Sequence, residues 1–197
     1  MIDEEYIERN KDDVNWDIIS CSLGLSEEFI ERNSDKVNWY WISYCQKLSE
    51  SFIDKYRDKV CWYYISIYQK LSDEFIERYK NKVNWDWISR YQELSEDFIE
   101  RWFDKIDWYL ISNYQELSEE FIEKWSEKVD WYWISMNQKL SCKFIGKYRE
   151  KIDWKYISFA QKLDIYFIEK NLDNLYLPYL YKNTKLEEEV KRMVFDL

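Results

Sequence analysis

Tryptophan recurs along the chain at a fixed interval of 23 residues, and this period constrains the fold more than any other feature of the sequence. An Ile-Ser pair begins three residues after each of these tryptophans, and a Phe-Ile or Tyr-Ile pair recurs with the same period. Self-similarity at a period of about 20–50 residues indicates a tandem-repeat protein, whose units bury their apolar faces against one another. The seven tryptophans are Trp16, Trp39, Trp62, Trp85, Trp108, Trp131 and Trp154.

The period divides nearly the whole chain into eight repeats. The eighth is degenerate, because Leu177 stands in the tryptophan position and Pro178 follows it. The residues after it have the apolar spacing of an amphipathic helix and are predicted to cap the array. We therefore predict a single repeat domain over 1–197, with repeats at 2–24, 25–47, 48–70, 71–93, 94–116, 117–139, 140–162 and 163–185 and a C-terminal cap at 186–197.

The first half of each repeat has the pattern of a short amphipathic helix, which we call helix A. In the repeat 25–47, Ser26 is a favoured N-cap, and acidic residues fill the first turn, where they complement the helix dipole. The pattern predicts a helix of two to three turns, with Phe29 and Ile30 on its buried side. Glu28 and Arg32 are spaced as an i,i+4 ion pair within this helix.

The second half of each repeat predicts another short helix, helix B. Asn38 is a favoured N-cap, and Trp39, Ile42, Ser43 and Gln46 share one face at i, i+3, i+4 and i+7. Isolated helices shorter than about 12–15 residues are marginal in water, so the repeats must stack to be stable. The predicted fold is therefore all-α, an αα-solenoid of eight 23-residue two-helix repeats with a C-terminal capping helix.

Two recurring side chains of helix B are expected to hold this stack together. The seven tryptophans are predicted to be structural keystones, because burying an indole removes roughly 150–250 Å² from water. The glutamine at 46, 69, 92, 115, 138 and 161 is a polar residue on the buried-looking face. We interpret it as bonding backbone groups where the two helices of a repeat meet; the alternative is a ladder of glutamines that grips a ligand.

Composition limits the possible functions. The chain has no His, which excludes His-based acid–base catalysis and His metal ligands. Its net charge of −10 opposes binding to nucleic-acid phosphates or anionic lipid, and no run of about 18 apolar residues could span a membrane. The sequence also shows no signal peptide. We expect a non-enzymatic cytoplasmic protein without cofactor or metal, whose cysteines stay reduced: Cys21, Cys45, Cys61 and Cys142.

The repeat motif L-S-E-x-F-I…K-V-[ND]-W-x-x-I-S-x-x-Q-K resembles the short tandem repeats of many giant DNA virus proteins and of some phage and bacterial proteins. This resemblance covers nearly the whole chain. It implies a helical-repeat protein of viral origin, located in the host cytoplasm, and it brings no established activity or binding residues. In outline the unit also resembles tetratricopeptide-type αα repeats, whose 34-residue period is longer.

A candidate partner-binding face lies on helix B, at the positions one and five residues after each tryptophan. These positions vary between repeats and point away from the recurring face, and Tyr, Arg and Met are enriched at protein interfaces. The candidate residues are Tyr40, Tyr44, Tyr63, Ile67, Asp86, Arg90, Tyr109, Asn113, Tyr132 and Met136.

Two interpretations of this face stay open on the sequence alone. Either it is a groove for a protein or peptide partner, or its aromatic residues only cover a thin core. The leading interpretation of the function is an interaction scaffold. The alternative is a structural or assembly element that acts by self-association or through its ends, and nucleic-acid binding is a distant third.

Overall fold

The computed structural model describes residues 4–22 and 24–195, and over these residues the chain is all-helical. Seventeen helices and no strand lie in the described part, arranged as a helical-repeat solenoid with a C-terminal helix. The predicted fold class is confirmed. Residues 2, 3 and 23 of the first predicted repeat and residues 196 and 197 of the predicted cap lie outside the described ranges.

The chain forms two compact units, residues 1–98 and 99–197, and the prediction of a single domain stays a prediction. Helix α9 (Glu96–Arg101) spans the boundary. The first unit holds α1 (Glu4–Arg9), α2 (Trp16–Cys21), α3 (Glu27–Arg32), α4 (Trp39–Cys45), α5 (Glu50–Lys55), α6 (Trp62–Tyr68), α7 (Asp73–Arg78) and α8 (Trp85–Tyr91). The second holds α10 (Trp108–Tyr114), α11 (Glu119–Lys124), α12 (Trp131–Asn137), α13 (Cys142–Lys147), α14 (Trp154–Ala160), α15 (Ile165–Lys170), α16 (Leu177–Lys182) and α17 (Glu188–Phe195).

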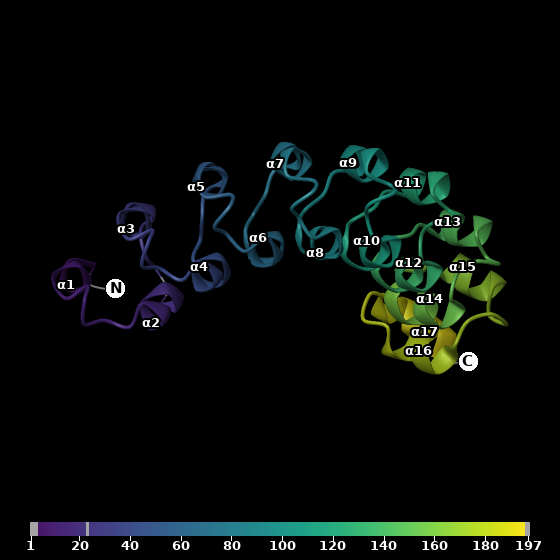
Figure 1. Ribbon diagram of the computed structural model, residues 1–197. Helices are drawn as coiled ribbons and strands as arrows, with labels where there is room; N and C mark the ends of the chain where they lie inside the picture. Colours follow the sequence, from purple (N-terminus) through teal and green to yellow (C-terminus); the bar gives the residue numbers. More distant parts are fainter. Residues whose placement is uncertain (1–3, 23, 196–197) are drawn as a thin grey trace. The chain divides into compact units, whose positions relative to one another are not determined.

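Each unit consists of two rows of helices (Figure 1). The odd-numbered helices up to α15 are the predicted A helices, and the even-numbered helices are the predicted B helices. The closest helix–helix contacts run along the B row, from α2 through α4 and α6 to α8 in the first unit and from α10 through α12 and α14 to α16 in the second. The C-terminal helix α17 packs against α15.

The A helices are shorter than the sequence predicts. Helix α3 begins at its N-cap Ser26, whose hydroxyl accepts a hydrogen bond from the Phe29 amide at 3.1 Å. It ends after six residues at Asn33, which adopts φ −112° and ψ 26°. A turn then brings Val37 back into the core, so one apolar side of the repeat is built from a helix of under two turns followed by a turn.

The B helices begin at the predicted caps. The Asn38 side chain accepts from the Tyr40 amide at 3.0 Å, and Asp153 caps α14 in the same way. Cys61 and Tyr176 make no side-chain cap hydrogen bond, since neither is a favoured N-cap residue.

The predicted keystone tryptophans are half-buried and lie between consecutive repeats, whereas the fully buried side chains are mostly isoleucines such as Ile42. The Trp39 indole N–H donates to the Ser34 carbonyl at 3.0 Å, which ties the start of α4 to the preceding turn. Its ring stacks on Phe52 of the next repeat at 6.2 Å between centroids, and Lys59 Nζ lies 5.6 Å from its centroid. Each tryptophan is therefore a contact between repeats as much as within one.

Serine and glutamine hydrogen-bond consecutive B helices to one another. The buried Ser43 hydroxyl donates to the Trp39 carbonyl at 2.7 Å and accepts from the Cys61 amide of the next repeat at 2.9 Å. This serine shares the inner face of helix B with Trp, Ile and Gln. Its hydroxyl is a hydrogen-bond relay that recurs in the other repeats, for example at Ser66 and Ser135.

The side-chain amides of Gln46, Gln69, Gln138 and Gln161 each bond three backbone groups. Gln69 Oε1 accepts from the Leu48 amide at 2.9 Å, and its Nε2 donates to the carbonyls of Ser43 at 3.3 Å and Gln46 at 2.8 Å. The prediction that the glutamine bonds backbone groups is therefore confirmed. The three groups lie at the junction between α4 and α5, so they join one repeat to the next and do not lie where the two helices of a single repeat meet. In the degenerate repeat Asn183 Nδ2 makes the two equivalent donor bonds, to Ser158 and Gln161.

The predicted ion pairs within helix A were wrong. Arg32 lies 3.4 Å from Glu8 of the preceding repeat, and Lys124 lies 2.6 Å from Glu100. The first-turn carboxylates also reach between repeats: Glu27 accepts from the Ser49 amide at 2.5 Å and from its hydroxyl at 3.0 Å. A helix of six residues offers few partners of its own, whereas the next A helix presents its cap and its last turn alongside.

Replacing Gln69 tests the role of this hydrogen bonding. In Gln69→Leu, three buried backbone groups lose their partner, and we expect the free energy of unfolding to fall by about 3 kcal/mol. Gln69→Asn should fall by less, because asparagine keeps an amide with the same donor and acceptor groups at this position. Chemical denaturation followed by circular dichroism measures both. A leucine variant as stable as the wild type would show that the bonds contribute nothing net.

A second pair of variants tests the tryptophan contacts. Trp62→Ala removes the ring that stacks on Phe75 at 6.3 Å and lies 4.7 Å from Tyr79, so we expect a loss of about 3 kcal/mol. Trp62→Phe keeps an aromatic ring there and loses the N–H bond to the Arg57 carbonyl, for which we expect about 1 kcal/mol. Denaturant titration distinguishes the two. Equal losses would mean that the ring contacts do not stabilise the array.

Candidate interaction surface

The two rows of helices leave one face of each B helix outside the core. Trp, Ile, Ser and Gln hold the inner face, so the residues one, two, five and six positions after each tryptophan form the outer face. In the first unit these positions fall on α4, α6 and α8, which contact one another in succession. The outer face is therefore continuous from helix to helix within the unit.

The structure places most of the predicted face at the surface. In the first unit Tyr40, Tyr44 and Tyr63 are between 42% and 48% exposed, and Asp86 is also exposed. In the second unit Tyr109 and Tyr132 are exposed. The other predicted residues are half-buried: Ile67, Arg90, Asn113 and Met136.

The aromatic rings of the first unit touch one another across three helices. Tyr64 lies 4.8 Å from Tyr40 and 5.1 Å from Tyr44 between ring centroids, and Tyr44 lies 4.9 Å from Tyr68. Tyr63 continues the contacts to α8 through Trp87 at 5.7 Å. Most of these pairs are edge-to-face, the geometry that aromatic pairs prefer. We call this set the aromatic face: Tyr40, Trp41, Tyr44, Tyr63, Tyr64, Tyr68, Trp87 and Tyr91.

Sequence reasoning missed part of this face. Tyr68 and Tyr91 are 51% and 47% exposed, and Tyr114 occupies the same position in the second unit. A signal existed, because these three tyrosines lie 23 residues apart. The position did not stand out, since other repeats have Ser, Cys, Asn or Ala there. The neighbouring position, two residues after each tryptophan, carries Tyr64 and Trp87, whose rings contact the adjacent B helix.

A shorter set of aromatic contacts lies in the second unit. Trp133 is 5.6 Å from Tyr109 and 4.7 Å from Tyr132, whose hydroxyl is 2.8 Å from that of Tyr156. The Trp133 Nε1 atom is buried and has no hydrogen-bond acceptor. Lys155 Nζ lies 5.1 Å from the ring centroid of Tyr179 on α16. Aromatic side chains thus line the outer faces of four consecutive B helices here, α10 to α16.

Hydrogen bonds between tyrosines alter the acidity of this surface. The hydroxyls of Tyr40 and Tyr64 are in contact, and this bond, with some burial, raises the pKa of Tyr64 to about 12. Burial and the bond to Tyr44 raise the pKa of Tyr68 as well. The Arg90 guanidinium lies 5.1 Å from the Tyr91 ring centroid, a cation–π contact. The raised pKa values keep the hydroxyls of Tyr64 and Tyr68 protonated at neutral pH.

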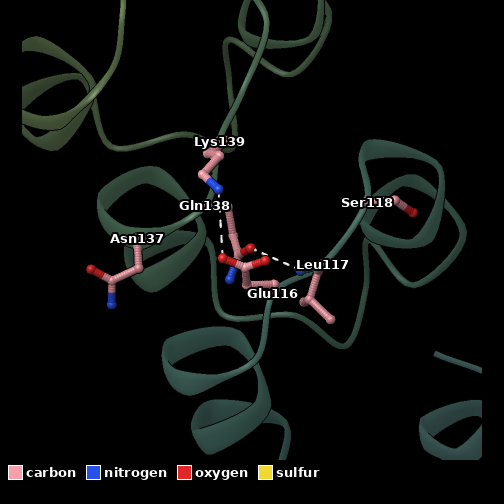
Figure 2. A pocket seen from close by; sticks show the side chains of 6 residues that line it. All are labelled: Glu116, Leu117, Ser118, Asn137, Gln138 and Lys139. Atoms are coloured by element: carbon pink, nitrogen blue, oxygen red, sulfur yellow. Dashed lines mark hydrogen bonds and ion pairs between the residues drawn. The ribbon is translucent and has the colours of Figure 1, made fainter. Parts of the chain in front are cut away.

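Small clefts lie at the junctions between consecutive repeats, and the recurring glutamine of helix B lines them. Figure 2 shows one of about 310 Å³, lined by Glu116, Leu117, Ser118, Asn137, Gln138 and Lys139. Gln138 Oε1 accepts from the Leu117 amide at 3.0 Å, and its Nε2 donates to backbone carbonyls. The exposed Lys139 and Glu116 side chains approach to 3.5 Å across the mouth. Because the amide of Gln138 is fully used by the backbone, this cleft does not support the ligand-gripping alternative.

Two further searches concern metals and membranes. Among the described residues, no three His, Cys, Asp or Glu side chains gather closely enough to hold a metal ion. No helix in the described part of the chain combines the length and apolar character needed to cross a membrane. The four cysteines are free thiols, and burial raises the pKa of Cys45 and Cys142.

The fold and this surface define the class of protein: a tandem helical-repeat protein with aromatic outer faces on its B helices. Compared with protein-family models, curated proteins and solved structures, the chain matches none of them.

The tyrosine contact predicts a measurable titration. With ring-labelled tyrosine and NMR detection, Tyr64 should keep its proton until about pH 12, well above the ordinary value near pH 10. In Tyr40→Phe its pKa should fall toward that ordinary value. Because the folded-state pKa is raised, any stabilisation by this bond is present below about pH 10 and is lost as the pH rises through about 12. An unchanged titration in the variant would show that the hydroxyls do not interact.

Proposed function

We propose that the chain is a non-enzymatic α-helical repeat scaffold that binds a protein or peptide through its aromatic B-helix face. One observation carries the proposal: eight aromatic side chains contact one another on α4, α6 and α8, yet five of the tyrosines remain between 42% and 51% exposed. Residues that only covered a core would gain from deeper burial. The partner's identity is open.

The chemistry of this face suits recognition of a polypeptide. Tyr, Trp and Arg are the side chains enriched at interface hot spots, and contiguous exposed apolar patches on soluble monomers are often functional. The rings hold one another in place, so a partner that docks on them would immobilise few free side chains. Tyrosine hydroxyls at the rim can bond peptide groups of the partner while the rings bury apolar surface.

Self-association is the second candidate, supported by the same exposed surface. A second copy of the chain could lay its aromatic face on the first, since a surface that pairs through a twofold axis must be complementary to itself. The scaffold would then be a structural or assembly element. Sedimentation equilibrium separates the two: a mass independent of concentration counts against self-association.

Nucleic-acid binding stays third. Several basic residues of the A helices pair with acids of neighbouring repeats, as in Lys55 with Glu31 and Lys124 with Glu100, and the chain carries a net charge of −10. The resemblance to giant-virus repeats supports assigning the scaffold to a viral protein acting in the host cytoplasm. Absence of binding to single- or double-stranded nucleic acid at low salt would remove the third candidate.

Substitution of three exposed tyrosines tests the scaffold. In Tyr44→Ser/Tyr63→Ser/Tyr68→Ser we expect unchanged helicity by circular dichroism and at least a tenfold loss of the proteins recovered by quantitative affinity capture, because removing hot-spot side chains typically costs about 1–2 kcal/mol or more each. The matched control changes three exposed residues of the A helices in the same unit: Tyr6→Ser, Glu28→Ser and Glu74→Ser.

Comparing the two triple variants distinguishes the possible functions. Recovery lost in the tyrosine variant and retained in the control supports the aromatic face. Equal recovery from both shows that the face is not the binding site. A wild-type dimer that the tyrosine variant converts to a monomer, without any captured partner, favours the assembly function instead.

A further inference from the structure

Helix α13 breaks the charge pattern of the A helices. In the other A helices up to α15 the fifth residue is acidic, whereas in α13 it is Gly146. The first two positions of α13 also differ, because Cys142 and Lys143 stand where most repeats have one or two acidic residues. The fifth-position acids are Glu8, Glu31, Asp54, Glu77, Glu100, Glu123 and Glu169.

Five of these seven acids have a defined contact with the following A helix. Glu8 accepts from Asn33 Nδ2 at 2.8 Å and lies 3.4 Å from Arg32 Nε. In the second unit Glu100 accepts from Lys124 Nζ at 2.6 Å and from the Trp125 indole at 3.4 Å. The last residue of an A helix and the residue after it thus form a receptor for the carboxylate of the preceding repeat. Lys55, Tyr79 and Lys147 make the same type of contact, with Glu31, Asp54 and Glu123.

The receptor is present opposite Gly146, although the carboxylate is missing. Lys170 and Asn171 occupy the positions of Arg32 and Asn33. Asn171 Nδ2 donates to the Phe167 carbonyl at 2.8 Å, just as Asn33 donates to Phe29, and its second amide hydrogen stays available for an acceptor. Among the described residues, neither Lys170 nor Lys143 makes an ion pair.

A cavity of about 380 Å³ lies at this place between α13 and α15. A Cβ added to Gly146 would meet no atom within 4 Å, and the helix does not require glycine there, because its φ is not positive. The glycine therefore serves neither packing nor backbone geometry, and glycine is a poor helix former. Its effect is to leave open the space that a carboxylate side chain fills in the other repeats.

The charges around the cavity favour an anion. Lys143, Arg149 and Lys170 line it, and the opposing lining residue is Asp164. Asp164 is engaged as the N-cap of α15, accepting from the Phe167 amide at 2.8 Å, and Arg149 lies 3.4 Å from Glu150. The two lysines thus remain uncompensated in an otherwise acidic chain.

We propose that this cavity binds a carboxylate supplied by another molecule, a Glu or Asp side chain of a protein or peptide. The ligand group would take the place that Glu8 holds against Arg32 and Asn33, with Lys170 and Asn171 as its donors. Tyr166, which is 71% exposed, adds an aromatic wall for the residue next to that side chain. The site lies on the A row, so it is separate from the aromatic B-helix face.

The test uses N-acetyl-glutamic acid α-amide as the probe and ¹H–¹⁵N NMR of the full chain as the readout. We expect saturable shifts of the Gly146 amide and the Asn171 side-chain amide, with a dissociation constant on the order of millimolar for a ligand of about a dozen heavy atoms. The isosteric N-acetyl-glutamine amide should bind at least tenfold more weakly. Gly146→Glu restores the repeat's own carboxylate and should abolish the shift at Asn171.

Gly146→Ala is the matched control, because it removes the glycine and adds neither charge nor clash. It should bind the probe like the wild type, and circular dichroism verifies that both variants fold. Equal binding of the glutamine analogue, or undiminished binding to Gly146→Glu, would overturn the proposal. Inorganic phosphate that binds tenfold more tightly than the glutamate probe would also overturn it, in favour of a phosphate site. None of these results bears on capture through the aromatic face.

Discussion

The hydrogen bonds that join each repeat to the one before it are the interactions on which this fold depends. Helices of six or seven residues leave most of their terminal peptide groups without a partner inside the helix. Gln69 bonds three such groups at the junction of α4 and α5, and Ser43 bonds both its own helix and the next cap. Because these groups are buried, an unmatched repeat would leave them unsatisfied, which makes stacking obligatory for polar as well as apolar reasons.

Aromatic residues have two distinct uses in this arrangement. Tryptophan and phenylalanine stack between consecutive repeats and are supported by lysines that lie over the indoles, as Lys59 lies over Trp39. Tyrosine holds the outer face of the B helices, where its rings contact one another but stay exposed. Only the second group is available to a partner. Part of the high aromatic content therefore serves packing between consecutive repeats, and the rest forms the outer surface of the B helices.

The sequence predicted what depends on local chemistry and on the period. The all-helical repeat fold, the N-caps and the backbone bonding of glutamine all follow from residue type and spacing. The helical wheel failed where the partner lies in another repeat: Arg32 contacts Glu8 and not Glu28, a pairing that only the stacking of two helices creates. Exposure of Tyr68 and Tyr91 also depended on that stacking. The sequence alone shows that Gly146 interrupts the row of acidic residues in the A helices. Only the structure shows that Lys170 lies at the same cavity.

The glutamine hydrogen bonds also determine which lengths of insertion or deletion the fold can accept. Each repeat supplies one amide to the junction before it and offers one junction to the amide that follows, so a whole 23-residue insertion or deletion keeps every buried peptide group matched. Any other length of insertion would shift the amide away from its carbonyls. Lengthening by copying one unit therefore keeps every junction intact, whereas an insertion of a few residues disrupts the hydrogen bonds of the junction that contains it.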